Sequence, residues 1–178
     1  MPLLSLYIIR CMDANYGLRI KRGSGAVVNT FTQWGIACMK VPFDIGAKTK
    51  DLPKRNWYDE HGDDTYIPSK MMFEAYDTEF ELACVVTGSA WNLSPALSKI
   101  DAFRKWLTGN DTDGGSGAEL SIYSPYSTIG RQGCYLLDFS NEDPVVQLSQ
   151  SSGNVYKENV VTFKVKFRIT DPITNITL

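Results

Sequence analysis

The chain has 178 residues, of which 43% are hydrophobic, and its 18 Lys and Arg against 20 Asp and Glu give a formal net charge of -2. This length and apolar content suit one globular domain, residues 1–178, that builds its own core. The charge balance lacks the basic excess of proteins dedicated to specific nucleic-acid recognition. No apolar run approaches the roughly 20 residues of a membrane span.

The amino-terminal part of the chain predicts short β-strands. Residues 2–9 are mostly apolar, but no Lys or Arg precedes them and no small-residue cleavage site follows. We therefore expect a strand over residues 3–10 instead of a signal peptide. Further strands are predicted at 16–22, 26–31 and 34–41, with the Gly23-Ser24-Gly25 segment suited to a tight hairpin.

Residues 44–69 differ in character from the segments on either side. They contain Gly and Pro at several positions, a basic group over 48–55 and an acidic run over 59–64, with no sustained period. Loops of this length in a compact domain are usually functional or mobile. We predict an extended arm or loop here.

One α-helix is predicted near 95–107, between two strands. Ser94 is a suitable N-cap and Pro95 a suitable first residue, and Gly109 follows the predicted end. The apolar residues at helical spacing, which we expect to form its buried face, are Leu97, Ile100, Phe103 and Leu107.

The remaining segments alternate as strands do, at 70–87, 119–124, 133–140, 145–149 and 155–170. In the last of them, every second residue from Val161 to Ile169 is apolar and the intervening ones are polar or basic. The predicted fold class is therefore mainly β, a β-sandwich or partly closed barrel with one inserted helix.

Catalytic and metal-binding patterns are weak. His61 is the single histidine, and it lies in the acidic run, whose spacing matches no EF-hand or zinc-protease motif. The four cysteines include no closely spaced pair, and Cys38 and Cys84 read as buried small hydrophobes. We therefore expect neither an enzyme nor a bound metal or cofactor.

The aromatic residues Trp34, Trp57, Tyr58 and Trp91 lie in or beside predicted loops, where they serve either as core residues or as interface anchors. Charged neighbours make Trp57 and Tyr58 the best anchors. The predicted interface comprises Arg55, Trp57, Tyr58, Asp59 and Tyr66. The basic residues Lys164, Lys166 and Arg168 are read as a solvated strand face.

The order of the predicted elements in the later part of the chain is similar to that of a known protein family. A strand is followed by a helix ending in FRKWL (103–107), a strand running into IYSPY (122–126), and a long last strand closing on Asp171-Pro172. This order resembles the amino-terminal domain of phage distal tail proteins and the related tail-tube group. The segment WYDEHGDDTYIP (57–68) is similar to stretches in prophage tail proteins of gut bacteria.

The resemblance implies a structural role in the virion tail, after synthesis in the bacterial host cytoplasm. Such proteins form rings, here expected to be hexameric, that join tail tube and tail tip around a DNA channel. Their partners are copies of themselves and other tail proteins. The alternative is a β-sandwich binding module without catalysis, for example one for carbohydrate.

Overall fold

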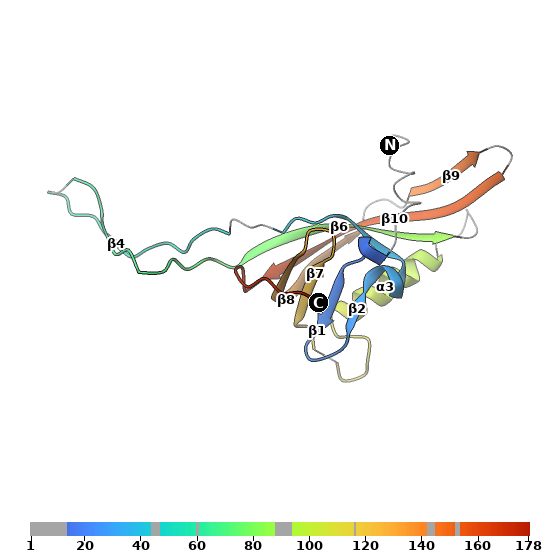
Figure 1. Cartoon of the computed structure of the whole chain (residues 1–178), viewed down its shortest axis with the longest axis horizontal. Helices are drawn as coiled ribbons and strands as arrows, with labels where there is room; N and C mark the ends of the chain where they lie inside the picture. Colours follow the sequence, from blue (N-terminus) through green and yellow to red (C-terminus); the bar gives the residue numbers. More distant parts are fainter. Residues whose placement is uncertain are drawn as a thin grey trace.

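The described part of the chain forms a curled antiparallel sheet, a helix packed on it and a long projecting hairpin (Figure 1). The computed structural model describes residues 14–43, 47–59, 61–87, 94–115, 117–141, 145–151 and 154–178. The predicted strand at 3–10, Cys11 and Trp91 lie outside these ranges. The elements are η1 (Ala14–Tyr16), β1 (Arg19–Arg22), β2 (Val27–Asn29), α2 (Thr30–Trp34), β3 (Ile36–Lys40), β4 (Lys54–Arg55), β5 (Asp64–Thr65), β6 (Tyr76–Thr87), α3 (Ser94–Leu107), β7 (Leu120–Ser124), β8 (Ile129–Asn141), β9 (Val145–Ser151) and β10 (Asn154–Ile169).

The main sheet confirms the predicted mainly β fold. Within the described ranges its strand order is β2-β1-β7-β8-β10-β6-β3, with β9 paired to β10 as well. β10 is the central strand, since its residues 158–169 pair with β6 on one side, and β8 and β9 pair with it on the other. The edge strands β2 and β3 share no ladder in the part of the chain described, so the barrel is not closed.

The short helix α2 connects the two edges of the sheet. Thr30 is buried there, where its Oγ1 accepts a hydrogen bond from the Leu18 backbone N–H at 3.0 Å and donates one to the Ile36 carbonyl at 2.8 Å. The sequence predicted strand through Phe31, which is wrong. The Asn29 side chain accepts hydrogen bonds from two backbone N–H groups, those of Phe31 and Thr32, and so caps a helix instead.

Helix α3 confirms the predicted helix, with one correction to its buried face. The buried residues are Ala96, Ile100, Phe103 and Leu107. Leu97, predicted to be buried, is 44% exposed, because it lies about 100° around the helix from Ala96. The helix ends at Leu107 and is followed, as predicted, by Gly109, which has a φ of 73° and donates its N–H to the Trp106 carbonyl at 3.2 Å.

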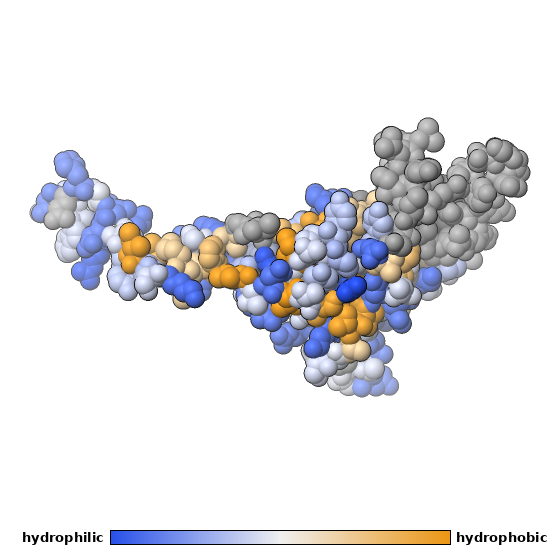
Figure 2. Space-filling model, in the orientation of Figure 1, coloured by the Kyte–Doolittle hydropathy of each residue, from blue (hydrophilic) through white to orange (hydrophobic). Residues whose placement is uncertain are grey.

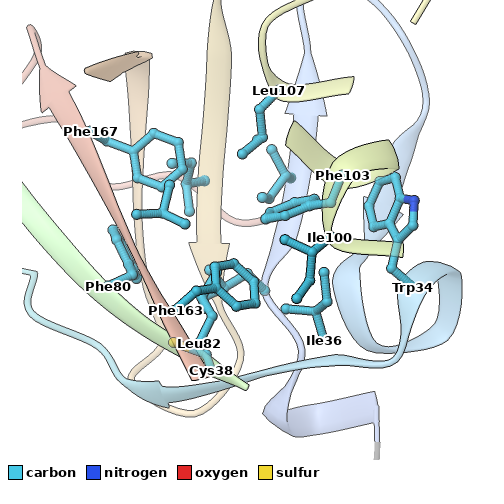
Figure 3. Close-up of a cluster of buried hydrophobic side chains, with 14 of the residues drawn as sticks. Trp34, Ile36, Cys38, Phe80, Leu82, Ile100, Phe103, Leu107, Phe163 and Phe167 are labelled. Atoms are coloured by element: carbon cyan, nitrogen blue, oxygen red, sulfur yellow. The ribbon is translucent and has the colours of Figure 1, made fainter. Parts of the chain in front are cut away.

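Aromatic side chains from the sheet and α3 fill the core. Phe80, Phe163 and Phe167 point from β6 and β10 toward Phe103 of α3 (Figure 3). The Phe80 and Phe167 ring centroids are 5.5 Å apart, and those of Trp34 and Phe103 are 5.1 Å apart. The alternation predicted for β10 is confirmed, since every second residue from Val161 to Ile169 is buried. The described body therefore shares one continuous apolar cluster.

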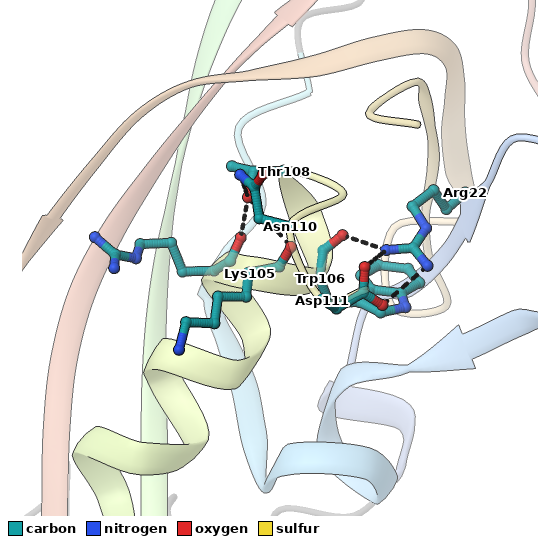
Figure 4. Close-up of polar contacts among 7 residues, drawn as sticks. Arg22, Lys105, Trp106, Thr108, Asn110 and Asp111 are labelled. Atoms are coloured by element: carbon teal, nitrogen blue, oxygen red, sulfur yellow. Dashed lines mark hydrogen bonds and ion pairs between the residues drawn. The ribbon is translucent and has the colours of Figure 1, made fainter. Parts of the chain in front are cut away.

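A polar clasp ties the β1–β2 hairpin to the end of α3 (Figure 4). Arg22 forms a two-point ion pair with Asp111, with Nη1 at 2.7 Å from Oδ1 and Nη2 at 3.0 Å from Oδ2. The same Nη1 donates to the Trp106 carbonyl at 2.7 Å, and the guanidinium lies 4.9 Å from the Trp106 ring centroid. The clasp thus holds the polar loop that follows α3 against the sheet.

Candidate functional site

The arm, defined here as residues 47–75, is a two-stranded ribbon that leaves the body after β3 and returns to it at β6 (Figure 1). At its base, Thr49 and Phe73 form a β-bridge, and the Lys50 N–H donates to the Met72 carbonyl at 2.8 Å. Near its tip, β4 and β5 pair Lys54 with Thr65 and Arg55 with Asp64. The arm predicted over 44–69 is therefore a hairpin, of which residues 44–46 and 60 lie outside the description.

The return leg of the arm corrects the predicted boundary of the following strand. Residues 70–75 were predicted to belong to that strand, but β6 begins at Tyr76. Glu74 instead donates its backbone N–H to the Lys48 carbonyl at 2.7 Å. Prolines interrupt the two legs, and Pro53 and Pro68 have no N–H to donate to a ladder. The arm consequently has few hydrogen bonds per residue compared with the main sheet.

Large apolar side chains of the arm face solvent. Tyr58 is fully exposed, and Trp57 is 48% exposed. Further along, Tyr66, Ile67 and Met72 are each more than half exposed. Figure 2 shows apolar surface along the arm between its mainly hydrophilic tip and the body. Exposed apolar residues gathered on one element are typical of surfaces that bind another molecule.

The arm also carries charges that are only weakly paired. Lys54 Nζ lies 3.4 Å from an Asp63 carboxylate oxygen, and Lys48 Nζ lies 3.6 Å from one of Glu74. These side chains are exposed, so the pairs contribute little to stability. Arg55 and Asp59 form no ion pair with any residue that the structure describes. Their charges therefore remain available to a partner.

All five predicted interface residues lie in the distal part of the arm. Arg55 belongs to β4, and Tyr66 follows β5 and donates its N–H to the Pro53 carbonyl at 3.1 Å. Trp57, Tyr58 and Asp59 lie in the segment that connects the two strands, and all are exposed. Their role in an interface stays a prediction. Sequence reasoning missed Ile67, Met71 and Met72, although apolar residues within a polar, unperiodic segment were a usable signal.

Trp34 and the basic candidates of β10 have structural partners. Trp34 is 8% exposed, so of the two alternatives, core residue and interface anchor, the structure shows a core residue. On the outer face of the sheet, Lys166 and Arg168 of β10 pair with Asp77 of β6 at 3.5 Å and 2.8 Å. The hydrogen bond from Arg168 is the main reason that the pKa of Asp77 is lowered. This strand face is thus largely neutralised within the chain.

The described cysteines are buried thiols. Desolvation raises the pKa of Cys38 and of Cys134 to about 12, and that of Cys84 to about 11. Thiols with such pKa values are almost entirely protonated at neutral pH and are poor nucleophiles. The prediction that Cys38 and Cys84 act as small hydrophobes is confirmed.

His61 is exposed at the tip of the arm. Across the described ranges, no group of three or more His, Cys, Asp or Glu side chains is placed to hold a metal ion. Among these residues, no helix combines the length and the apolarity that crossing a bilayer requires.

Comparison with known proteins adds no identification. No protein-family model matches the chain, and no curated protein matches it.

Proposed function

We propose that this chain is a non-enzymatic structural subunit of a phage or prophage tail. In this proposal it forms a hexameric ring that joins tail tube and tail tip around the DNA channel, in contact with other tail proteins. The observation that carries the proposal is the arm, a projecting hairpin whose large apolar side chains have no core of their own. The order of elements in the body, which resembles distal tail proteins, supports it.

The physics of the arm favours assembly over small-ligand binding. An isolated two-stranded hairpin is at best marginally stable in water. Fully burying one large apolar side chain contributes about 1.5–3 kcal/mol, so covering Tyr58, Ile67 and Met72 on a partner would stabilise both the contact and the hairpin. A projecting ribbon also reaches further than a compact loop. An arm that lies on a neighbouring subunit would use both its exposed apolar side chains and its reach.

The charge arrangement on the sheet supports a role without specific nucleic-acid recognition. The basic residues of β10 face acidic residues of β6, with Lys164 3.9 Å from Glu79 in addition to the pairs at Asp77. Paired side chains offer fewer free cations to phosphates than an unpaired basic strand would. A ring could therefore surround DNA without reading its sequence.

The alternative function is a binding module, such as one for carbohydrate. The full exposure of Tyr58 next to the half-exposed Trp57 favours it, because flat aromatic rings can stack on sugars. The two proposals differ in what these rings contact: another protein subunit or a soluble glycan.

The test compares three proteins: the wild type, the W57A/Y58A double variant and Y126A. Tyr126 is 81% exposed on the body, so Y126A is a matched aromatic control away from the arm. Native mass spectrometry and negative-stain microscopy would be applied to each protein alone and co-expressed with the neighbouring tail gene products. We expect rings from the wild type and Y126A, and none from W57A/Y58A. A wild type that stays monomeric and enters no tail assembly, but binds glycans through Trp57, would refute the tail role.

A further inference from the structure

A pocket lies where the arm joins the body. Its volume is about 340 Å³. Three parts of the chain line it: the two legs of the arm, β8 and the carboxy-terminal tail. Its lining residues are Ala47, Phe73, Ile129, Arg131, Pro172, Ile173 and Asn175. Except for Arg131 and Asn175, these side chains are apolar.

The carboxy-terminal tail is held firmly as one wall of this pocket. Asp171 accepts hydrogen bonds from the backbone N–H groups of Ile173 and Thr174 at 3.3 and 3.1 Å. Asn175 Oδ1 then accepts one from the Gly130 N–H at 2.7 Å. A Cβ at Gly130 would lie 2.4 Å from the Ile176 carbonyl oxygen, so only glycine lets the tail approach β8 this closely. The pocket is therefore a fixed feature of the body.

Arg131 is the unusual group in the pocket. It is only 5% exposed, yet it forms no ion pair with any described residue. Its Nη1 donates to the Gly130 carbonyl at 3.0 Å, while its Nε is buried without a hydrogen-bond partner. Burying a charge without a counter-charge is costly. A guanidinium among mostly apolar walls is suited to a carboxylate attached to an apolar group, because the planar fork can donate two parallel hydrogen bonds to it.

The tip of the arm has the complementary chemistry. Tyr58 is fully exposed, and the adjacent Asp59 is an exposed carboxylate without an ion pair among the described residues. The arm extends away from the body, so its tip lies far from the pocket at its own base (Figure 1). Arg131 of β8 thus lies at the base of the arm, and Tyr58 and Asp59 lie near its tip; neither charged group has an ion pair among the described residues.

We propose that this pocket receives Tyr58 and Asp59 from the arm of a second copy of the chain. Asp59 would accept hydrogen bonds from Arg131, and the Tyr58 ring would pack on Phe73 and Ile173. The contact is head-to-tail, so that each copy offers one tip and one pocket, and such contacts generate rings when the rotation closes. The inference rests on the proposed ring-forming function and names the partner site for the arm.

The first test measures self-association of the full chain by sedimentation velocity. D59N should weaken the association at least about tenfold, because it removes the charge that Arg131 binds. D51N is the matched control, since Asp51 is an exposed carboxylate on the same arm but nearer its base, and it should change nothing. Equal association of D59N and the wild type would overturn the proposal.

The pocket side is tested with R131M. Methionine keeps much of the volume without the charge, so the monomer should melt no earlier than the wild type while self-association falls about tenfold. If R131M fails to fold, disulfide trapping decides instead. H61C and I173C would be mixed on a C11S background, which leaves Asp59 in place; Ile173 is 59% exposed at the pocket rim, and His61 is exposed at the arm tip. An H61C–I173C dimer on a non-reducing gel is expected, and D51C with I173C should give none. Failure of the first pair to cross-link would overturn the proposal.

A carboxylate from the same chain is the competing explanation. Asp44 lies three residues before Ala47 in the sequence, outside the described residues. Under the proposal, D44N leaves both the melting temperature of the monomer and its self-association unchanged. If D44N instead destabilises the wild-type monomer but not the R131M monomer, then Asp44 is the counter-charge of Arg131 and the proposal is refuted. The proposed function can be tested separately from this contact. Rings that persist in D59N, without the 61–173 cross-link, would refute this contact and leave the tail role standing.

Discussion

In the body, aromatic side chains pack on one another, whereas in the arm they face solvent. Phe80, Phe103, Phe163 and Phe167 are at most 1% exposed, while Trp57 and Tyr58 are half to fully exposed. The hydrogen bonding differs in the same way, since β10 pairs continuously with β6 but the legs of the arm meet only at intervals. The body therefore carries its own stability, and the arm carries surface suited to another molecule.

The largest loss of stability is expected from a substitution in the core of the body. F103A should lower the free energy of unfolding by about 3–5 kcal/mol, because the ring is fully buried between Trp34 and Phe163 and its removal leaves a cavity. Urea denaturation measures this. L97A, on the exposed face of the same helix, is the control and should cost less than about 1 kcal/mol. Similar losses in the two variants would mean that the two faces of α3 are not distinguished by burial.

A smaller loss is expected from opening the polar clasp. R22A should lower the free energy of unfolding by about 1–3 kcal/mol, since it removes a two-point ion pair and a hydrogen bond to the Trp106 carbonyl. A double-mutant cycle with D111N isolates the pair. Additive effects of the two substitutions would show that Arg22 and Asp111 contribute independently and that the clasp adds nothing.

The anchored tail should make part of the stability depend on acid. Burial would raise the pKa of Asp171, but hydrogen bonds from Gln132, Thr174 and Ile173 outweigh it and lower the pKa from 3.8 to about 2. This contribution is present above pH 4 and is lost as the pH falls from about 4 to 2. After allowance for solvent screening it is on the order of 1 kcal/mol. The difference in unfolding free energy between the wild type and D171N should shrink over that range; a constant difference would contradict the assignment.

The smallest effect is expected in the arm of the isolated subunit. Y58A should change the free energy of unfolding by less than about 0.5 kcal/mol, because the exposed side chain has no packing to lose. Thermal and urea unfolding of monomeric protein measure this. A loss of 2 kcal/mol or more would show that Tyr58 packs on the body, and the contrast between the two regions would then be wrong.

The regular elements of the body follow from local sequence pattern. Alternation from Val161 to Ile169 predicts β10 and its buried face, because a strand places successive side chains on opposite sides. Helical spacing and Gly109 likewise predict α3 and its end. The arm is visible in the sequence as a polar, proline-containing stretch, and its exposed Trp57 and Tyr58 are predicted from their charged neighbours.

Only the tertiary structure decides what each element meets. The sequence could not show that β2 and β3 approach across α2, since this depends on the curl of the sheet and on buried Thr30. Helical spacing fits Leu97 as well as Ala96, and the surface that α3 covers selects Ala96. Arg131 reads as an ordinary strand residue until the tail, β8 and the base of the arm enclose it. Burial is set by contacts between residues distant in sequence, so the pocket and its buried Arg131, which has no ion pair among the described residues, arise only once the chain has folded.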